Sequence, residues 1–275
     1  MNFVKTHALG NDFILVERAG VAGPLDGLAR KICNRHFGVG ADGLILWEQR
    51  NDVFHLQIFN SDGSEAECSG NGLRCAAAYL MEFGRWRGPE IRLQTASGIY
   101  TLRRDGPAFE ADMGVPQLHP EQIPFAPDAS NGGALDAVVN YPLKLDGEEI
   151  RITACSTGNP HCSIFVEALD DETVKRVGPR LEHHRSFPNR TNVEFVHVLN
   201  DREIEVAFWE RGAGWTYASG TGSCAAVVAA VLNGRTGRRV TVHTRGGRLF
   251  VDWQDNGRLK LISTANVVAE GRYFE

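Results

Sequence analysis

Two stretches of this sequence repeat one pattern about 150 residues apart. Residues 66–80 read AECSGNGLRCAAAYL, and residues 218–230 read ASGTGSCAAVVAA. Each places a serine and a glycine-containing turn before an alanine-rich segment. Serine is a favoured N-cap residue and glycine permits a tight turn, so both stretches predict the start of a helix, over about 70–83 and 220–232. A chain that repeats such a signal is constrained to fold as two similar halves.

Other segments repeat in the same order. LGNDFILVE (9–17) matches TGNPHCSIFVE (157–167), and NRHFGVGADGLIL (34–46) resembles NRTNVEFVHVL (189–199). FNSDGSEAECSGNG (59–72) corresponds to FWERGAGWTYASGTG (208–222). Ser69 and Ser219 are 150 residues apart, Asn11 and Asn159 are 148 apart, and the two Asn-Arg pairs are 155 apart. Ordered matches at a nearly constant spacing predict a pseudo-symmetric pair of domains.

The remaining sequence is rich in strand signals. Segments such as FHLQIF, NVEFVHVL, EIEVAFWE and RVTVHT carry β-branched or aromatic residues in partial alternation. Two further helices are expected near residues 24–33 and 172–181. The two helices that follow the glycine turns are apolar on most faces, which predicts that both are buried. The fold class is therefore α+β.

Composition narrows the class of partner. The chain has 275 residues, of which 43% are hydrophobic and 23% charged, with a formal net charge of −5. The absence of a long basic run argues against nucleic acid or a membrane as the main partner, and the longest apolar run is too short to span a bilayer. No signal-peptide pattern is present at the first residues, so we expect a cytoplasmic protein. The six cysteines are interpreted as buried thiols, and no metal-binding spacing is evident.

The serine-glycine motifs have two interpretations. For an isolated copy, helix capping alone is the more economical one. In a duplicated frame, two helix N-termini are expected to converge on a cleft between the halves. Their free N–H groups and dipoles would bind a small anion such as a carboxylate. Ser69 and Ser219 would then flank the ligand, an arrangement suited to removing a proton from one face of a carbon and returning one to the other.

The ordered motifs resemble the diaminopimelate epimerase family. They are HALGNDF, NRHFGVGADGLI, FNSDGSEAE, GNGLRC, STGNPH, RTNVEF, WERGAG and GTGSCAA, and they span essentially the whole chain. The resemblance implies two barrel-like domains, each a sheet wrapped around a central helix, with the active site in the cleft. The expected domains are 1–115 with 263–275, where the last strand returns to the first domain, and 116–262. It further implies a homodimer that binds diaminopimelate and uses no pyridoxal phosphate, other cofactor or metal.

The resemblance also assigns the catalytic positions, and here the sequence departs from the family. The family carries cysteine in Cys-Gly-Asn-Gly and Cys-Gly-Thr-Gly, whereas this chain has Ser69 and Ser219 at those positions. A thiol has a pKa of about 8.5, and an aliphatic hydroxyl approaches the value of about 15.7 for water. The difference makes the serine anion harder to form by about 7 to 9 kcal/mol. His161 and Glu210 are therefore expected to act beside the serines as acid–base groups.

The substrate-binding set implied by the resemblance is largely retained. Arg211 would pair with a substrate carboxylate, while asparagine side chains and Glu210 would hold carboxylate and ammonium groups. Backbone N–H groups at the two helix starts would bind the reacting carboxylate. Two departures are Asp42, where some members have a different polar residue, and Trp215, where glutamate is usual. The set comprises Asn11, Asn60, Gly70, Asn71, Asn159, Asn192, Glu210, Arg211, Gly220 and Thr221.

Three hypotheses for function follow. The first is an epimerase that inverts one α-carbon of LL-diaminopimelate to give the meso form, for lysine and peptidoglycan precursor synthesis. The second is a related racemase with another amino-acid substrate. The third is a natural or engineered inactive form that binds substrate without turnover, because both catalytic cysteines are serine. A one-residue shift that brings Cys68 into the first catalytic position is a less favoured alternative.

Overall fold

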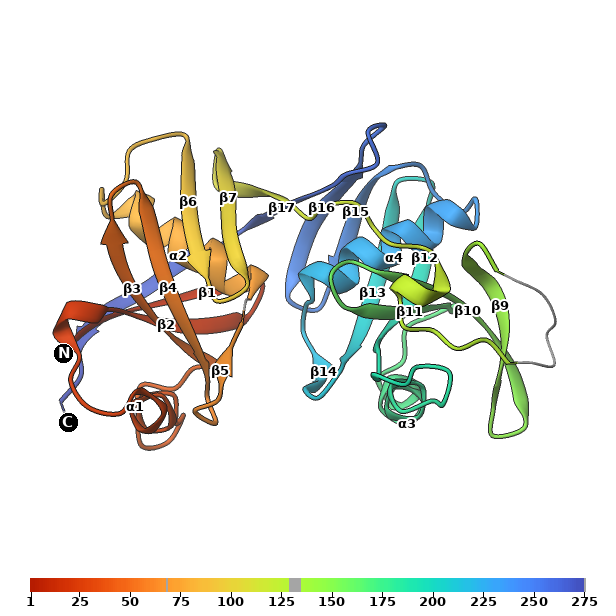
Figure 1. Cartoon of the computed structure of the whole chain (residues 1–275), viewed down its shortest axis with the longest axis horizontal. Coiled ribbons are helices and arrows are strands. Elements are labelled where there is room, and N and C mark those ends of the chain that lie inside the picture. Colours follow the sequence, from red (N-terminus) through yellow and green to blue (C-terminus); the bar gives the residue numbers. More distant parts are fainter. Residues whose placement is uncertain (68, 129–134, 275) are drawn as a thin grey trace. The chain divides into compact units, whose positions relative to one another are not determined.

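The chain divides into two compact units in the computed structural model. The structure describes residues 1–67, 69–128 and 135–274. The first unit comprises Met1–Ala111 and Ile262–Glu275, and the second comprises Asp112–Leu261. Figure 1 shows that each unit contains a long helix, α2 in the first and α4 in the second, beside strands of its own sheet. Each unit is described separately below.

The first unit is a mixed sheet with two α-helices. The strands run in the order β18–β1–β2–β3–β4–β6–β7–β8, with β5 paired to β4. The β2–β3 and β4–β6 pairs are parallel and the others are antiparallel. The elements are β1 (Asn2–Ala8), β2 (Asn11–Glu17), the 3-10 turn η1 (Arg18–Gly20), α1 (Leu25–Ile32), β3 (Gly43–Arg50), β4 (Val53–Asn60), β5 (Glu65–Ala66), α2 (Gly70–Glu82), β6 (Glu90–Thr95), β7 (Gly98–Asp105), β8 (Ala108–Asp112) and β18 (Asn266–Arg272).

The second unit repeats this topology. Its strands run β9–β10–β11–β12–β13–β15–β16, with β14 paired to β13, and the β11–β12 and β13–β15 pairs are parallel. The helices α3 and α4 occupy the same places in the chain order as α1 and α2. The elements are η2 (Pro120–Gln122), β9 (Val138–Leu145), β10 (Glu148–Ser156), β11 (Pro160–Phe165), α3 (Asp171–Glu182), β12 (Asn192–Asn200), β13 (Glu203–Glu210), β14 (Gly214–Thr216), α4 (Gly220–Leu232), β15 (Arg239–Thr244) and β16 (Gly247–Trp253), and β17 (Leu259–Thr264) contains the boundary with the first unit. The predicted pseudo-symmetric α+β fold is confirmed.

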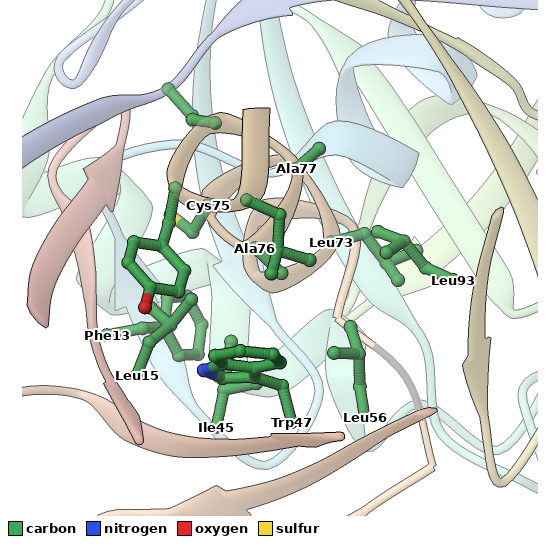
Figure 2. Close-up of a cluster of buried hydrophobic side chains, with 14 of the residues drawn as sticks. Phe13, Leu15, Ile45, Trp47, Leu56, Leu73, Cys75, Ala76, Ala77 and Leu93 are labelled. Carbon is green, nitrogen blue, oxygen red and sulfur yellow. The ribbon is translucent and has the colours of Figure 1, made fainter. Parts of the chain in front are cut away.

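Alternation along the strands explains why both faces of the first sheet are covered. Phe13 and Leu15 on β2 pack with α2, and Figure 2 shows them with Ile45 around this helix. Ile14 and Val16, the intervening residues, pack with α1 on the opposite face. Successive side chains of a strand point to opposite faces, so a strand covered on both faces reads as a continuous apolar run. FILV in β2 is such a run.

The expected burial of the two long helices is also confirmed. Residues 72–80 of α2 and residues 222–230 of α4 are all buried. The two other helices form where they were predicted, α1 over Leu25–Ile32 and α3 over Asp171–Glu182. The five described cysteines are buried free thiols, as interpreted from the sequence. The strand predicted to return to the first unit does so, because β18 pairs with β1.

Candidate active site

The first predicted helix start is capped by its serine. Ser69 has an extended backbone (φ −143°, ψ 115°) and its Oγ accepts a hydrogen bond from the N–H of Gly72 at 3.1 Å. A side chain at Gly72 would bring its Cβ within 3.1 Å of Ile45 Cδ1 and 3.3 Å of Ser69 Oγ. A side chain at position 72 would press on Ile45 and on the serine cap, so glycine favours the close approach of the helix start to the sheet. The N–H groups of the first turn of a helix have no partner within it, so they are available for an anion.

Substitution of Gly72 should distinguish the effect of this packing on the free energy of unfolding from the effect of helix propensity. Gly72→Ala is expected to lower the free energy of unfolding by about 1 to 3 kcal/mol, because the new Cβ overpacks against β3. Gly70→Ala is the matched control, since a Cβ there meets only Arg74 Nη1 at 3.8 Å. Urea unfolding of both variants checks the prediction. Equal stability of the two variants would contradict it.

The second helix start has the same geometry. Ser219 is extended (φ −131°, ψ 127°), 4% exposed, and its Oγ accepts from the N–H of Gly222 at 3.2 Å. A Cβ at Gly222 would approach Glu194 Oε1 and Phe208 to 3.0 Å. Both serines therefore act as N-caps, so the capping interpretation is correct for both copies. Capping leaves the hydroxyl proton of each serine free to make a further hydrogen bond.

Ser219 also donates a hydrogen bond to a carboxylate. Ser219 Oγ donates to Glu210 Oε2 at 3.1 Å, and Thr216 Oγ1 donates to Glu210 Oε1 at 2.7 Å. Glu210 is the last residue of β13, and in the strand register its counterpart in the first unit is Asn60, the last residue of β4. Asn60 Nδ2 donates to Ser64 Oγ at 2.9 Å. The structure therefore places a carboxylate, a possible proton acceptor, directly on Ser219.

His161 lies in a buried hydrogen-bonded chain. Its side chain has no exposed surface; Nε2 is 2.8 Å from Asn159 Oδ1 and Nδ1 is 2.6 Å from Glu194 Oε1. Ser163 Oγ donates to the other oxygen of Glu194 at 3.4 Å. Burial raises the pKa of Glu194, and the neighbouring His161 opposes that effect. His161 and Asn159, both predicted site residues, are thus joined, and Glu194 is an addition that sequence reasoning missed.

Asn192 connects three of the predicted motifs. Its Nδ2 donates to Pro160 O at 2.9 Å, and its Oδ1 accepts from the backbone N–H of Arg211 at 2.9 Å. Arg211 Nη1 donates to Asn189 O at 3.1 Å, and the rest of its side chain is exposed. The asparagine therefore fixes the loop that carries Arg211. Thr221 and Gly220 form the first turn of α4, as predicted.

In the first unit, Asn11 and Asn71 are joined directly. Asn71 Nδ2 donates to Asn11 Oδ1 at 3.1 Å, and Asn11 Nδ2 donates to Asp42 Oδ2 at 2.9 Å. Arg74 donates to Asn71 Oδ1. Asp42, which the sequence marked only as a departure, is therefore a partner of a predicted binding residue. Asn60 bonds within its own turn, and Cys68, the alternative catalytic residue, lies outside the described residues.

A second carboxylate, Asp12, anchors Asp42. Asp12 is 3.0 Å from Lys5 Nζ, accepts from Arg35 Nη2 at 2.8 Å, and accepts from the backbone N–H of Asp42 at 3.0 Å. Arg35 Nη2 also donates to Asp42 Oδ1 at 2.7 Å. Burial alone would raise the pKa of Asp12, but hydrogen bonds from Arg35 and Lys5 and their charges outweigh it and lower the pKa to about 2.

The low pKa of Asp12 predicts a contribution to stability that depends on pH. Its pKa is lower in the folded than in the unfolded chain, so the contribution is present above about pH 4 and is lost as the pH falls towards 2. Asp12→Asn should lower the free energy of unfolding at pH 7 by about 1 to 2 kcal/mol, after allowance for partial solvent screening. Denaturant unfolding between pH 7 and pH 3 measures this, with the exposed Asp52→Asn as control. A loss that did not shrink with falling pH would contradict the assignment.

Comparisons with known proteins agree with the repeat. A family model described as diaminopimelate epimerase matches residues 3–119 and 153–269, two segments whose first residues are 150 apart. A diaminopimelate epimerase of Pelotomaculum thermopropionicum is 48% identical over 283 residues, covering 99% of each chain. One of Synechocystis is 44% identical over 282 residues, covering 99% of this chain and 98% of that protein.

Solved structures share the fold at low identity. A predicted epimerase from Pseudomonas aeruginosa has a TM-score of 0.67 at 18% identity and covers 100% of this chain and 99% of its own. A hydroxyproline epimerase from Agrobacterium vitis, solved with trans-4-hydroxy-L-proline, has a TM-score of 0.68 at 14% identity, covering 98% and 90%. Among the residues that the structure describes, no helix is long and apolar enough to cross a membrane.

The duplicated α+β topology is the fold class that these solved structures share with the chain. Within that class, full-length identity of 40 to 48% to curated relatives and the family match over both halves identify the group. The chain belongs to the diaminopimelate epimerase family.

Proposed function

We propose that this chain inverts one α-carbon of LL-diaminopimelate to give meso-diaminopimelate, without pyridoxal phosphate. The observation that carries the proposal is the 48% identity to a diaminopimelate epimerase over 99% of both chains. The geometry supports it. Each serine-capped helix start has backbone N–H donors of the kind that bind a carboxylate, and such donors stabilise the negative charge that develops when the α-proton leaves.

We propose that Ser219 and Ser69 act on the same carbon in a two-base exchange. Ser219 Oγ takes the α-proton while its own proton passes to Glu210, whose carboxylate already accepts that hydrogen bond at 3.1 Å. The electron pair of the C–H bond remains on the substrate, and Ser69 donates its hydroxyl proton to the opposite face. Return of the proton from Glu210 to the Ser69 alkoxide through solvent restores both residues. The opposite epimer would be processed by the reverse sequence.

The other members of the proposed site have supporting roles. His161 is proposed as an acid–base helper, and the exposed Arg211 as the partner of a substrate carboxylate. Asn11, Asn60, Asn159 and Asn192 are proposed to bind the polar groups of the substrate. The backbone N–H groups of Gly70, Asn71, Gly220 and Thr221 are proposed to hold the reacting carboxylate.

Incubation with LL-diaminopimelate in D₂O tests the function. We expect incorporation of deuterium at the α-carbon together with formation of the meso form, followed by mass spectrometry and chiral chromatography. Binding without exchange would identify an inactive substrate-binding form. Exchange of another amino acid with no binding of diaminopimelate would identify a racemase of different specificity.

Three further properties of the chain are also proposed. Residues 1–115 with 263–275, and residues 116–262, are proposed as the two domains, and limited proteolysis near residues 115 and 262 tests those limits. A homodimer is proposed from the family relationship, and light scattering after size-exclusion chromatography measures the mass in solution. A cytoplasmic location is proposed because the function is biosynthetic, and cell fractionation tests it.

A further inference from the structure

We infer that Glu194 is a positioning residue which, through His161, orients the amide of Asn159 so that its Nδ2 faces the ligand. This rests on the proposed function in one respect, because Asn159 is taken to contact the substrate. An amide nitrogen is a donor and has no acceptor capacity. The orientation therefore makes this position select an acceptor such as a carboxylate and reject an ammonium group.

The hydrogen bonds fix the proton positions. Asn159 Oδ1 lies 2.8 Å from His161 Nε2, and a carbonyl oxygen only accepts, so Nε2 carries a proton. On the other side of the ring, Nδ1 lies 2.6 Å from Glu194 Oε1, and a second proton lies between these two atoms. Whichever of the two holds it, Nε2–H continues to face Asn159. Burial raises the pKa of Glu194, which favours the carboxyl form that donates to Nδ1.

The same positions in the first unit show that the fold does not need this pair. In the strand registers of the two units, Phe13 corresponds to His161, and Ile45 corresponds to Glu194. Phe13 is 5% exposed and Ile45 is fully buried, so hydrocarbon fills the equivalent space. His161 is also fully buried and Glu194 is 1% exposed.

Burial of an ionisable pair is often less favourable than burial of well-packed apolar residues. The topology of the second unit can therefore accommodate apolar side chains in place of His161 and Glu194. A purely structural role does not explain why the second unit has this ionisable pair, whereas a role in orienting Asn159 does. Glu194 is also where a side chain on Gly222 would collide, so the pair lies directly beneath the start of α4.

The double variant His161→Phe with Glu194→Ile gives the second unit the residues of the first. We expect its melting temperature to be unchanged or higher, because the replacement is apolar and occurs in a frame that accepts these residues. We expect its Kd for diaminopimelate to rise at least tenfold, because Asn159 is then free to rotate. Ser163→Ala, which removes a neighbour of Glu194 but leaves His161 and Asn159 in place, is the control and should bind normally.

Calorimetric titration with diaminopimelate measures the Kd, and thermal unfolding measures the melting temperature. A lower melting temperature with unchanged Kd would show a structural role and overturn the inference. Should the double variant not fold, ¹⁵N NMR of the His161 ring in the wild-type chain decides. The resonance is assigned by its loss in His161→Asn, and a protonated Nε2 at neutral pH is expected.

An unprotonated Nε2 would mean that Asn159 presents Nδ2 to the ring, and it would overturn the inference. The NMR measurement needs no substrate. If the wild-type chain does not bind diaminopimelate, the proposed function fails, while the ring tautomer still reports on the Glu194 contact.

Discussion

Turnover of LL-diaminopimelate should rise at least a thousandfold when Ser69→Cys and Ser219→Cys are combined. A thiol ionises at a pKa roughly five to seven below that of a hydroxyl, which is worth about 7 to 9 kcal/mol in forming the basic anion. Glu210 already assists Ser219, so the full difference is not expected at that residue. Steady-state formation of the meso form measures the effect, and one substitution alone should recover only part of it.

The control for the cysteine variants is Thr101→Cys, which adds a thiol at an exposed position on β7. Its turnover should equal that of the parent chain. Unchanged turnover in the double variant, with the fold retained by circular dichroism, would show that positions 69 and 219 do not transfer the protons.

Replacement of the carboxylate beside Ser219 is expected to have the second large effect. Glu210→Gln keeps the size of the side chain and an oxygen that can accept from Thr216, but it removes the group that takes the proton of Ser219. General-base assistance is typically worth about 10² to 10⁴ in rate. We expect deuterium exchange at the α-carbon to fall by that factor when the substrate is saturating.

A matched control for Glu210 lies on the same strand. Glu205 is exposed on β13, and Glu205→Gln changes the net charge identically without touching Ser219. Its exchange rate should match that of the parent chain. An equal loss in both variants would indicate a long-range charge effect instead of proton transfer. A higher Kd for substrate in Glu210→Gln, with an unchanged exchange rate, would show that this residue acts in binding only.

The helices and the repeat were predictable because their signals are local or periodic. Ser69 and Ser219 follow the preference for a serine cap, and glycines at the third helical position permit close approach to the sheet. Three of the asparagines expected to bind substrate, Asn11, Asn60 and Asn192, are terminal residues of β2, β4 and β12. Here local sequence and fold agree.

The partners of these residues could not be predicted, because they come from distant strands. The Glu194–His161 contact joins residues 33 apart and depends on the parallel register of β11 and β12. The single signal was a glutamate within the apolar strand NVEFVHV, where a buried carboxylate needs a partner. Asp12 gave a similar signal in NDFILV, and its link to Arg35 is likewise set by the fold.

The pairing of β18 with β1 has a consequence for biosynthesis of the protein. The backbone of residues 266–272 pairs with β1 at the edge of a sheet whose strands β1 to β8 have all been translated by residue 112. During synthesis the second unit, Asp112–Leu261, is therefore fully exported from the ribosome before the first can close its sheet. Until then the edge of β1 that β18 will cover stays unpaired, and an unpaired strand edge can pair with another chain.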